Sequence, residues 1–477
     1  MTNLIEPDTA GEHRFPVTNN LSYMYQLYCS YILLFKNTDA CADFMSAGIL
    51  QQGLQMLVRS HYRPVAGWYE VCGDKIESVY DDQTFNDPPF SKQELDIEFD
   101  ELAKHVNDSN ETLLVPAAPA GLISKETRKD LPMFLVKATY LSSNKGMALG
   151  VKYHHSLFDG ASFWPFMNNW AYVCKTIVDR QGAPSSSDAV DIPFPPVFGF
   201  PDLEGTQQEE NVQTPKQFAH PEYELVPPEN CFKEFQACGD AMKETKMRIE
   251  VAEQHEIRAS AKIAGVSFIS MLSALLWKEV NRLRLVAKPG VGSERSLYTC
   301  TVNPRAALGL PANLCASPVL NSAVTRSVAE IAQFETNDLA VLVNQTIDQC
   351  NSSEYMRSSI RFLLAHRAHE LDDERNGRMP DKKLMLVYIC PAAVKCTVSS
   401  SRTFPIYHTN FGFGSPAYVR PPYLPFDGCW RIWPTPESAA GVAPGSAVVK
   451  EAPIEIYLTQ PEYIDPAESP LIRRFLV

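Results

Sequence analysis

The sequence predicts an α/β protein of two domains. Its 477 residues are too many for one ordinary hydrophobic core, and strand-like and helix-like segments alternate in both halves. Between the halves, residues 182–229 are rich in Pro, Ser, Asp, Glu and Gln and lack sustained periodicity, which is typical of an extended surface connection. We therefore predict an N-terminal domain over residues 1–181, a crossover over residues 182–229 and a C-terminal domain over residues 230–477.

The first half opens with a predicted strand, helix and second strand. Residues 31–35 form an apolar run, and apolar residues recur at helical spacing over residues 50–58. Pro64 ends this helix, because proline lacks a backbone N–H and crowds the preceding turn. A strand then begins at residues 68–71, and residues 81–132, rich in Asp, Glu, Asn and Pro, indicate loops with short helices.

A predicted hairpin follows. The apolar runs 133–141 and 146–154 flank the turn-forming sequence Ser-Ser-Asn-Lys-Gly. The second run alternates large apolar and small or polar residues, and a period of two marks a strand. Aromatic and apolar residues then recur at helical spacing over residues 163–174, so a helix comes directly after the hairpin.

The second half repeats the alternation. A stripe of apolar residues from Leu272 to Leu283 opposes Lys278, Glu279 and Arg282, which predicts an amphipathic helix. Strands are expected at residues 247–251, 297–302, 383–389 and 454–458.

Composition excludes several classes of function. The formal net charge of -13 disfavours nucleic acid and anionic membranes as partners. We find no apolar run of about 18 residues for a transmembrane helix, and the polar N-terminal segment lacks the layout of a signal peptide, so we expect a cytoplasmic protein. The twelve cysteines are scattered without a CxxC pair, and no His, Cys and Glu cluster predicts a metal site.

The most informative residues join the predicted hairpin to its helix. They read His-His-Ser-Leu-Phe-Asp-Gly over residues 154–160. A neutral imidazole has a pKa of about 6.5 and accepts a proton near neutrality, so His155 is a candidate general base. Asp159 can fix the shape of the turn, and Gly160 permits backbone angles that other residues resist. A His and an Asp four residues apart are common by chance, and His154 is expected to be a hydrogen-bonding or packing residue.

This string resembles the HHxxxDG motif of the BAHD acyltransferases, a motif shared with other CoA-dependent acyltransferases and with condensation domains. The BAHD family also has a DFGWG motif, which the sequence Asn-Phe-Gly-Phe-Gly at residues 410–414 resembles. Segments resembling other family stretches run in register from about residue 20 to 460, including Asn303-Pro304-Arg305. Asn410 and Phe413 replace the family's usual Asp and Trp, a variation similar to fungal relatives such as trichothecene O-acetyltransferases.

The resemblance implies a fold and a mechanism. The fold would be two chloramphenicol-acetyltransferase-like domains with a channel at their interface, and family members are usually monomers. His155 would take a proton from an acceptor O–H or N–H as that atom attacks the thioester of acyl-CoA, without a covalent acyl-enzyme and without a bound cofactor. Asp159, grouped with His155 as the catalytic pair, would point away from substrate and form an ion pair with Arg305.

The resemblance also assigns supporting and CoA-binding residues. The loop containing Asn410, Gly412 and Gly414, together with Gly160 and Arg305, would support the site. CoA contacts are assigned to Arg258, Ser399, Ser400 and Phe413. For Arg258 a solvated helix face is at least as good an alternative, and for the two serines an ordinary polar strand face is an equal one.

Three functions therefore remain open at this point. The favoured one is a free-standing acyltransferase that moves an acyl group, by family analogy acetyl, from CoA to a hydroxyl or amine of a small secondary-metabolite acceptor. The second is a condensation-type enzyme that takes its acyl group from a carrier protein. The third is a non-catalytic binding protein that has kept the fold.

Overall fold

The computed structural model describes residues 11–18, 28–72, 75–83, 85–106, 111–117, 131–180, 191–199, 218–227, 242–375, 382–387, 394–421, 423–424, 426–442 and 451–477. Much of the predicted crossover, residues 182–190, 200–217 and 228–229, lies outside these ranges.

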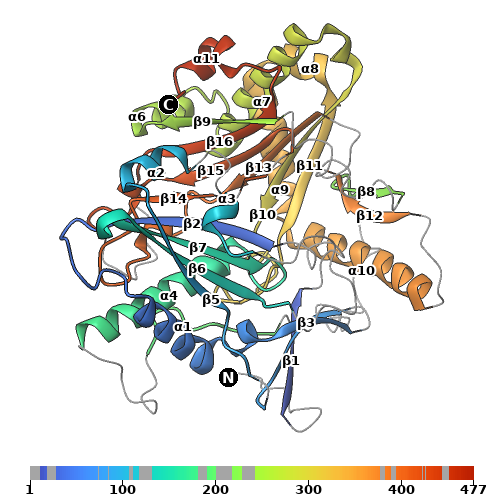
Figure 1. Cartoon of the computed structure of the whole chain (residues 1–477). Helices are drawn as coiled ribbons and strands as arrows, with labels where there is room; N and C mark the ends of the chain where they lie inside the picture. Colours follow the sequence, from blue (N-terminus) through green and yellow to red (C-terminus); the bar gives the residue numbers. More distant parts are fainter. Residues whose placement is uncertain are drawn as a thin grey trace.

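A mixed sheet forms the centre of the first half (Figure 1). Its described strands run in the order β14-β2-β7-β6-β5, with only the β5–β6 pair parallel. Their bounds are Tyr418–Arg420 (β14), Tyr28–Lys36 (β2), Gly146–His154 (β7), Phe134–Leu141 (β6) and Phe90–Leu95 (β5). The expected strand at residues 31–35 and the expected hairpin are thus present, and a 3-10 turn at Ser142–Asn144 connects the hairpin.

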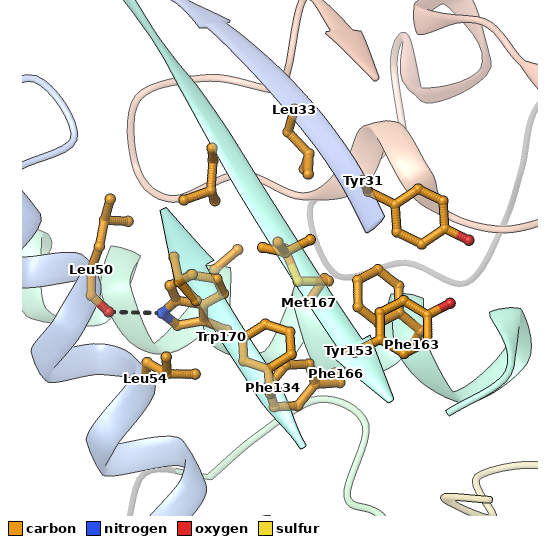
Figure 2. Packing of buried hydrophobic residues seen from close by; sticks show 14 of the residues in the cluster. Tyr31, Leu33, Leu50, Leu54, Phe134, Tyr153, Phe163, Phe166, Met167 and Trp170 are labelled. Atoms are coloured by element: carbon orange, nitrogen blue, oxygen red, sulfur yellow. Dashed lines mark hydrogen bonds between the residues drawn. The ribbon is translucent and has the colours of Figure 1, made fainter. Parts of the chain in front are cut away.

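Two helices cover one face of this sheet, α1 (Ala47–His61) and α4 (Gly160–Asp179) (Figure 1). Between them and the sheet lies an aromatic core in which Trp170 is fully buried and donates a 2.9 Å hydrogen bond from Nε1 to the Leu50 carbonyl (Figure 2). The shorter helices α2 (Phe99–His105) and α3 (Glu111–Leu114) pack against the opposite face. Burial on both faces makes the sheet a rigid base for the residues at its ends.

The remaining elements of the first half follow the N-terminal helix. A 3-10 helix at Arg63–Ala66 contains Pro64, so α1 ends just before the proline, as predicted. A small antiparallel sheet of order β1-β4-β3 comprises Glu12–Thr18 (β1), Lys75–Asp81 (β4) and Trp68–Cys72 (β3).

A second sheet organises the other half. Its described strands run β11-β10-β13-β15-β16-β9. Their bounds are Leu320–Ser327 (β11), Arg295–Val302 (β10), Val394–Ser400 (β13), Cys429–Pro434 (β15), Ile454–Pro461 (β16) and Met242–Ile249 (β9). Helices accompany this sheet at Val251–Ala259 (α6), Phe268–Ala287 (α7), Val328–Gln333 (α8), Thr336–Cys350 (α9), Ser353–Arg375 (α10) and Pro470–Arg473 (α11). The predicted amphipathic helix is α7, whose apolar stripe packs into this core.

The structure corrects several predicted elements. Residues 90–95, expected to be loop, form the edge strand β5. The strand expected at 247–251 begins earlier and ends at Ile249, because Val251 already starts α6. The strand expected at 383–389 is present as β12 (Lys383–Leu386), which pairs with β8 (Tyr223–Val226) in a separate ribbon, and residues 388–389 lie outside the described ranges.

One strand connects the two halves. β14 belongs to the second half by sequence, yet it pairs antiparallel with β2, with Tyr418 opposite Leu34 and Arg420 opposite Ile32. The α/β class with two sheet-rich halves is therefore as predicted. Within the part of the chain that the structure describes, no helix has the length and apolar character to cross a membrane.

Candidate active site

The HHSLFDG sequence lies where β7 gives way to α4. β7 ends at His154, and Asp159 is the N-cap of α4. The Asp159 carboxylate accepts a 3.0 Å hydrogen bond from the Ser162 backbone N–H, and the Ser162 hydroxyl bonds the Asp159 N–H at 3.1 Å. This reciprocal cap satisfies backbone donors that a helix start leaves free, so the turn between strand and helix is fixed.

Asp159 also forms a bidentate ion pair with Arg305. The Arg305 Nη1 and Nη2 atoms lie 2.6 and 3.0 Å from the two carboxylate oxygens, and both side chains are almost fully buried. Nη2 further donates to the carbonyls of Leu314 and Ala316 at 2.9 and 3.0 Å. Planar, charge-assisted contacts of this kind fix orientation strongly. The pair therefore joins the turn of the first half to the β10–β11 loop of the second.

The candidate base, His155, is half-buried directly after β7. Its Nδ1 atom lies 3.2 Å from the hydroxyl of Ser317, which belongs to the same loop that Arg305 holds. Burial lowers the pKa of His155, but the adjacent Cys29 side chain and, after it, Asp159 raise that pKa to about 9. Ser317 of the second half thus contacts this imidazole, while Cys29 and Asp159 of the first half favour its protonated form.

The neighbouring His154 has a different environment. It is fully buried, bonds the Ser156 hydroxyl at 2.6 Å and packs edge-on against the Tyr28 ring at 5.2 Å. Alternation along the strand directs His154 and His155 to opposite sides. The structure therefore gives His154 the local hydrogen-bonding and packing contacts expected for it.

The reason for glycine at position 160 differs from the expected one. Gly160 does not have a positive φ angle, so backbone freedom does not require it. A Cβ atom at this position would instead lie 2.4 Å from the ring of Phe404. The requirement is steric, because the segment before the NFGFG loop packs directly against the start of α4.

In the NFGFG loop, Asn410 organises two glycines. Its Oδ1 atom accepts hydrogen bonds from the Gly412 and Gly414 backbone N–H groups at 2.9 and 3.1 Å. Both glycines have positive φ angles, +103° and +97°, which other residues rarely adopt. The amide of Asn410 therefore supplies the acceptor that the loop needs, without a negative charge.

The aromatic residues of this loop pack into the first half. Phe411 is buried with its ring 5.0 Å from that of Trp170, and Phe413 packs edge-on against Phe44 at 5.5 Å. The loop thus attaches the second half of the chain to the α1–α4 core. The contact between Phe413 and CoA stays a prediction.

The other residues assigned to CoA lie on the second half. Arg258 lies in the last turn of α6, pairs with Glu451 at 2.9 Å and lies over the Phe268 ring at 5.0 Å. Arg402 approaches the same ring at 5.6 Å, and its pKa is lowered by burial and by Arg258. Ser399 and Ser400 are half-buried at the end of β13.

The comparisons with known proteins decide the family. A model of the Transferase family matches residues 2–444. The chain belongs to the Transferase family. The family assignment confirms the expected enzyme class, a CoA-dependent acyltransferase of the BAHD type.

Similar proteins agree with this membership of the Transferase family. Rosmarinate synthase of Plectranthus scutellarioides is 24% identical over 420 residues, 84% of each chain. A BAHD acyltransferase of Arabidopsis thaliana is 23% identical over 430 residues, 86% of this chain and 80% of the relative. The solved structure of F. graminearum TRI101 with coenzyme A and T-2 mycotoxin has a TM-score of 0.67 at 15% identity, covering 97% of this chain and 98% of the other, and confirms the two-domain fold.

Within this Transferase-family site, sequence reasoning missed two residues. Ser317 falls in a stretch that matches no preserved family motif, although its hydroxyl touches the candidate base. Arg402 lies eight residues before the NFGFG loop, and only its packing on Phe268 beside Arg258 brings it to notice. A search for serines or arginines alone could not have selected either from the chain.

Proposed function

We propose that this chain transfers an acyl group, acetyl in the simplest case, from CoA to a hydroxyl or amine of a small secondary-metabolite acceptor. One observation supports it most directly: His155 is a half-buried imidazole at the junction of β7 and α4, in contact with Ser317 from the other half. The proposal includes a monomeric enzyme of the cytoplasm, as inferred from the sequence.

His155 acts in its neutral form. It removes the proton from the acceptor as the acceptor oxygen or nitrogen attacks the thioester carbonyl, and positioned bases of this kind contribute roughly 10²- to 10⁴-fold in rate. The tetrahedral intermediate then expels CoA, which leaves as a thiol after receiving the proton. Cys29 adjusts the pKa of the base and carries no acyl group in this scheme. Asp159 and Arg305 hold the turn and transfer no proton.

CoA is assigned to the second half. Arg258 and Arg402 converge on Phe268, next to Ser267, which caps the N-terminus of α7. Two guanidinium groups and a helix N-terminus suit phosphate groups. Ser399 and Ser400, at the end of β13, are assigned to the pantetheine arm. TRI101, which shares the fold, has been solved with coenzyme A and with T-2 mycotoxin, and this supports a channel for a thioester and a small acceptor.

The decisive experiment measures release of free CoA thiol. Purified enzyme receives acetyl-, malonyl- and longer acyl-CoAs with pooled alcohols and amines, alongside His155→Ala and the distant control His13→Ala. We expect acceptor-dependent release that only His155→Ala abolishes. Release by His155→Ala at the wild-type rate would reject this residue as the base. Failure of wild-type enzyme to bind acyl-CoA, measured by calorimetry, would favour a carrier-protein donor or a non-catalytic relative.

A further inference from the structure

A buried cluster of charges lies where the two halves meet. Glu244 on β9 receives two guanidinium groups, one from Arg420 on β14 at 2.8 Å and one from Arg431 on β15. The side chains of Arg420 and Arg431 are only 5% and 4% exposed. Two buried cations therefore share one carboxylate.

The adjacent charges do not neutralise this excess. Lys246, two residues along β9, pairs with Glu455 at 2.9 Å, so that carboxylate is already engaged. Among the side chains that these contacts join, three cations face two carboxylates, and one positive charge is left over. A buried charge without a counter-charge is costly unless a further anion accompanies it.

The same two arginines have free hydrogen-bond donors. Arg420 Nη1 and Arg431 Nε and Nη1 are buried and have no hydrogen-bond partner among the described residues. Tyr457 lies against the faces of both guanidinium groups, with centroid distances of 5.4 and 5.6 Å. Stacking occupies the faces and leaves the N–H edges available, and those edges are the part that recognises a carboxylate.

The cluster is directed toward the catalytic half. Arg431 and Trp433 are two residues apart on β15, so their side chains project from the same face of the strand. The Trp433 ring lies 5.8 Å from the ring of Tyr31 on β2. Burial and Cys29 raise the pKa of Tyr31, whereas a hydrogen bond from Tyr153 and the charge of Arg431 lower it. Cys29 is also the side chain next to His155.

On the other side, Arg431 adjoins a residue assigned to the donor. It is paired with Ser399 on the neighbouring strand β13, and paired residues of adjacent strands project from the same face. The cluster therefore lies beside the proposed pantetheine path as well as beside the side chains that surround the base.

We infer that Arg420 and Arg431 bind a carboxylate group of one of the two substrates, an inference that rests on the proposed acyl transfer. The unpaired donors, Arg420 Nη1 and Arg431 Nε and Nη1, carry five N–H bonds, and the two oxygens of one carboxylate accept up to four hydrogen bonds, so a carboxylate supplies acceptors for several of them. The carboxylate belongs either to the acyl group of a dicarboxylic acyl-CoA or to an acidic acceptor.

A single substitution separates this role from a structural one. In Arg431→Gln, Arg420 and Glu244 still form a one-to-one ion pair, so we expect the thermal midpoint without ligand to be kept. Sodium malonate, compared with chloride at equal ionic strength, should stabilise wild-type protein and the matched control Arg248→Gln but not Arg431→Gln. Arg248 is a cation of β9 whose side chain is 28% exposed. Equal stabilisation of all three proteins would overturn the inference. If Arg431→Gln does not fold, Arg420→Gln serves in its place.

Two binding measurements then distinguish the sources. Calorimetry compares malonyl-CoA with acetyl-CoA, and a panel of hydroxy acids with their methyl esters, using the His155→Ala background so that no turnover is needed. A hydrogen-bonded charge contact gives roughly 10- to 100-fold in affinity, and Arg431→Gln should remove that preference in one comparison. If Arg431→Gln loses the preference for malonyl-CoA over acetyl-CoA, the carboxylate belongs to the donor. If it loses the preference for hydroxy acids over their methyl esters, the carboxylate belongs to the acceptor. An unchanged preference in both would overturn the inference, while transfer of acetyl to neutral acceptors would still stand.

Discussion

Arg305 lies across both carboxylate oxygens of Asp159, at 2.6 and 3.0 Å, although 146 positions separate them in the chain. The same guanidinium holds the carbonyls of Leu314 and Ala316, immediately before Ser317. Since the Ser317 hydroxyl touches His155, this ion pair also positions the loop that contacts the proposed base. A residue pair to which the proposed mechanism gives no proton transfer thus helps to hold the imidazole in place.

Asp159→Asn should therefore destabilise the protein as well as slow it. Arg305 would stay buried with its charge uncompensated, and breaking a buried pair costs about 3–5 kcal/mol. Urea unfolding measures this difference. The control is Asp179→Asn, which breaks the exposed Lys175–Asp179 pair and should cost about 0.5 kcal/mol at most. Equal losses of unfolding free energy in the two variants would mean that the Asp159–Arg305 pair stabilises the fold no more than an exposed ion pair does.

Ser317→Ala should affect catalysis without affecting donor binding. Without the contact to Nδ1, the His155 imidazole is held less firmly, and the activation free energy should rise by about 1–1.5 kcal/mol. This corresponds to roughly a tenfold decrease in kcat/KM. Stopped-flow thiol release gives the rate, and calorimetry gives the affinity for acyl-CoA. Weaker CoA binding with an unchanged rate would assign Ser317 to the donor site instead.

The rate should rise with pH across the neutral range. The base must be neutral, and the pKa of His155 is raised to about 9, so the active fraction grows until pH passes that value. Cys29→Ala removes the main influence that raises the pKa, so burial, which lowers the pKa, is opposed only by smaller effects such as that of Asp159. The acidic limb of the kcat/KM profile should then move to lower pH, whereas Cys41→Ala, on a partly buried thiol elsewhere, should leave it in place. An unmoved limb in Cys29→Ala would show that Cys29 does not control the base.

Gly160→Ala tests the steric contact with Phe404. The added Cβ would lie 2.4 Å from the ring, and overpacking of this kind costs about 1–3 kcal/mol. The double variant with Phe404→Leu should recover most of the lost unfolding free energy. If the double variant is as unstable as the sum of the single ones, the backbone rather than the ring is the source of the cost.

Asn410→Ala should loosen the NFGFG loop. It removes the acceptor shared by the Gly412 and Gly414 N–H groups and should cost about 1–2 kcal/mol of unfolding free energy. Asn410→Asp keeps the oxygen in place, so both stability and thiol release should stay close to wild type. Inactivity of a stable Asn410→Asp variant would instead indicate that the neutral amide is needed.

The sequence could predict what local patterns encode. The HHSLFDG string, the period of two before it and the aromatic spacing after it locate the strand, the turn and the helix correctly. β5 was missed because Phe90–Leu95 is a polar edge strand without a continuous apolar run, and β14 has only three residues.

Contacts that depend on three-dimensional packing could not be predicted in this way. The ion pair of Asp159 with Arg305 was expected only through family resemblance. Glu244 and Arg431 are 187 positions apart, and neither lies in a motif. Their meeting depends on the strand order of a whole sheet, which periodicity does not encode.

Completion of the first sheet has a consequence for biosynthesis. β2 leaves the ribosome long before its partner β14 at Tyr418–Arg420, because several hundred residues separate the two strands. At about 5–20 residues per second, the edge of β2 waits roughly tens of seconds for its last neighbour. During that interval an apolar strand edge is open to chaperones or to other nascent chains. Truncations that stop before residue 418 should therefore yield aggregates rather than an autonomous amino-terminal fragment.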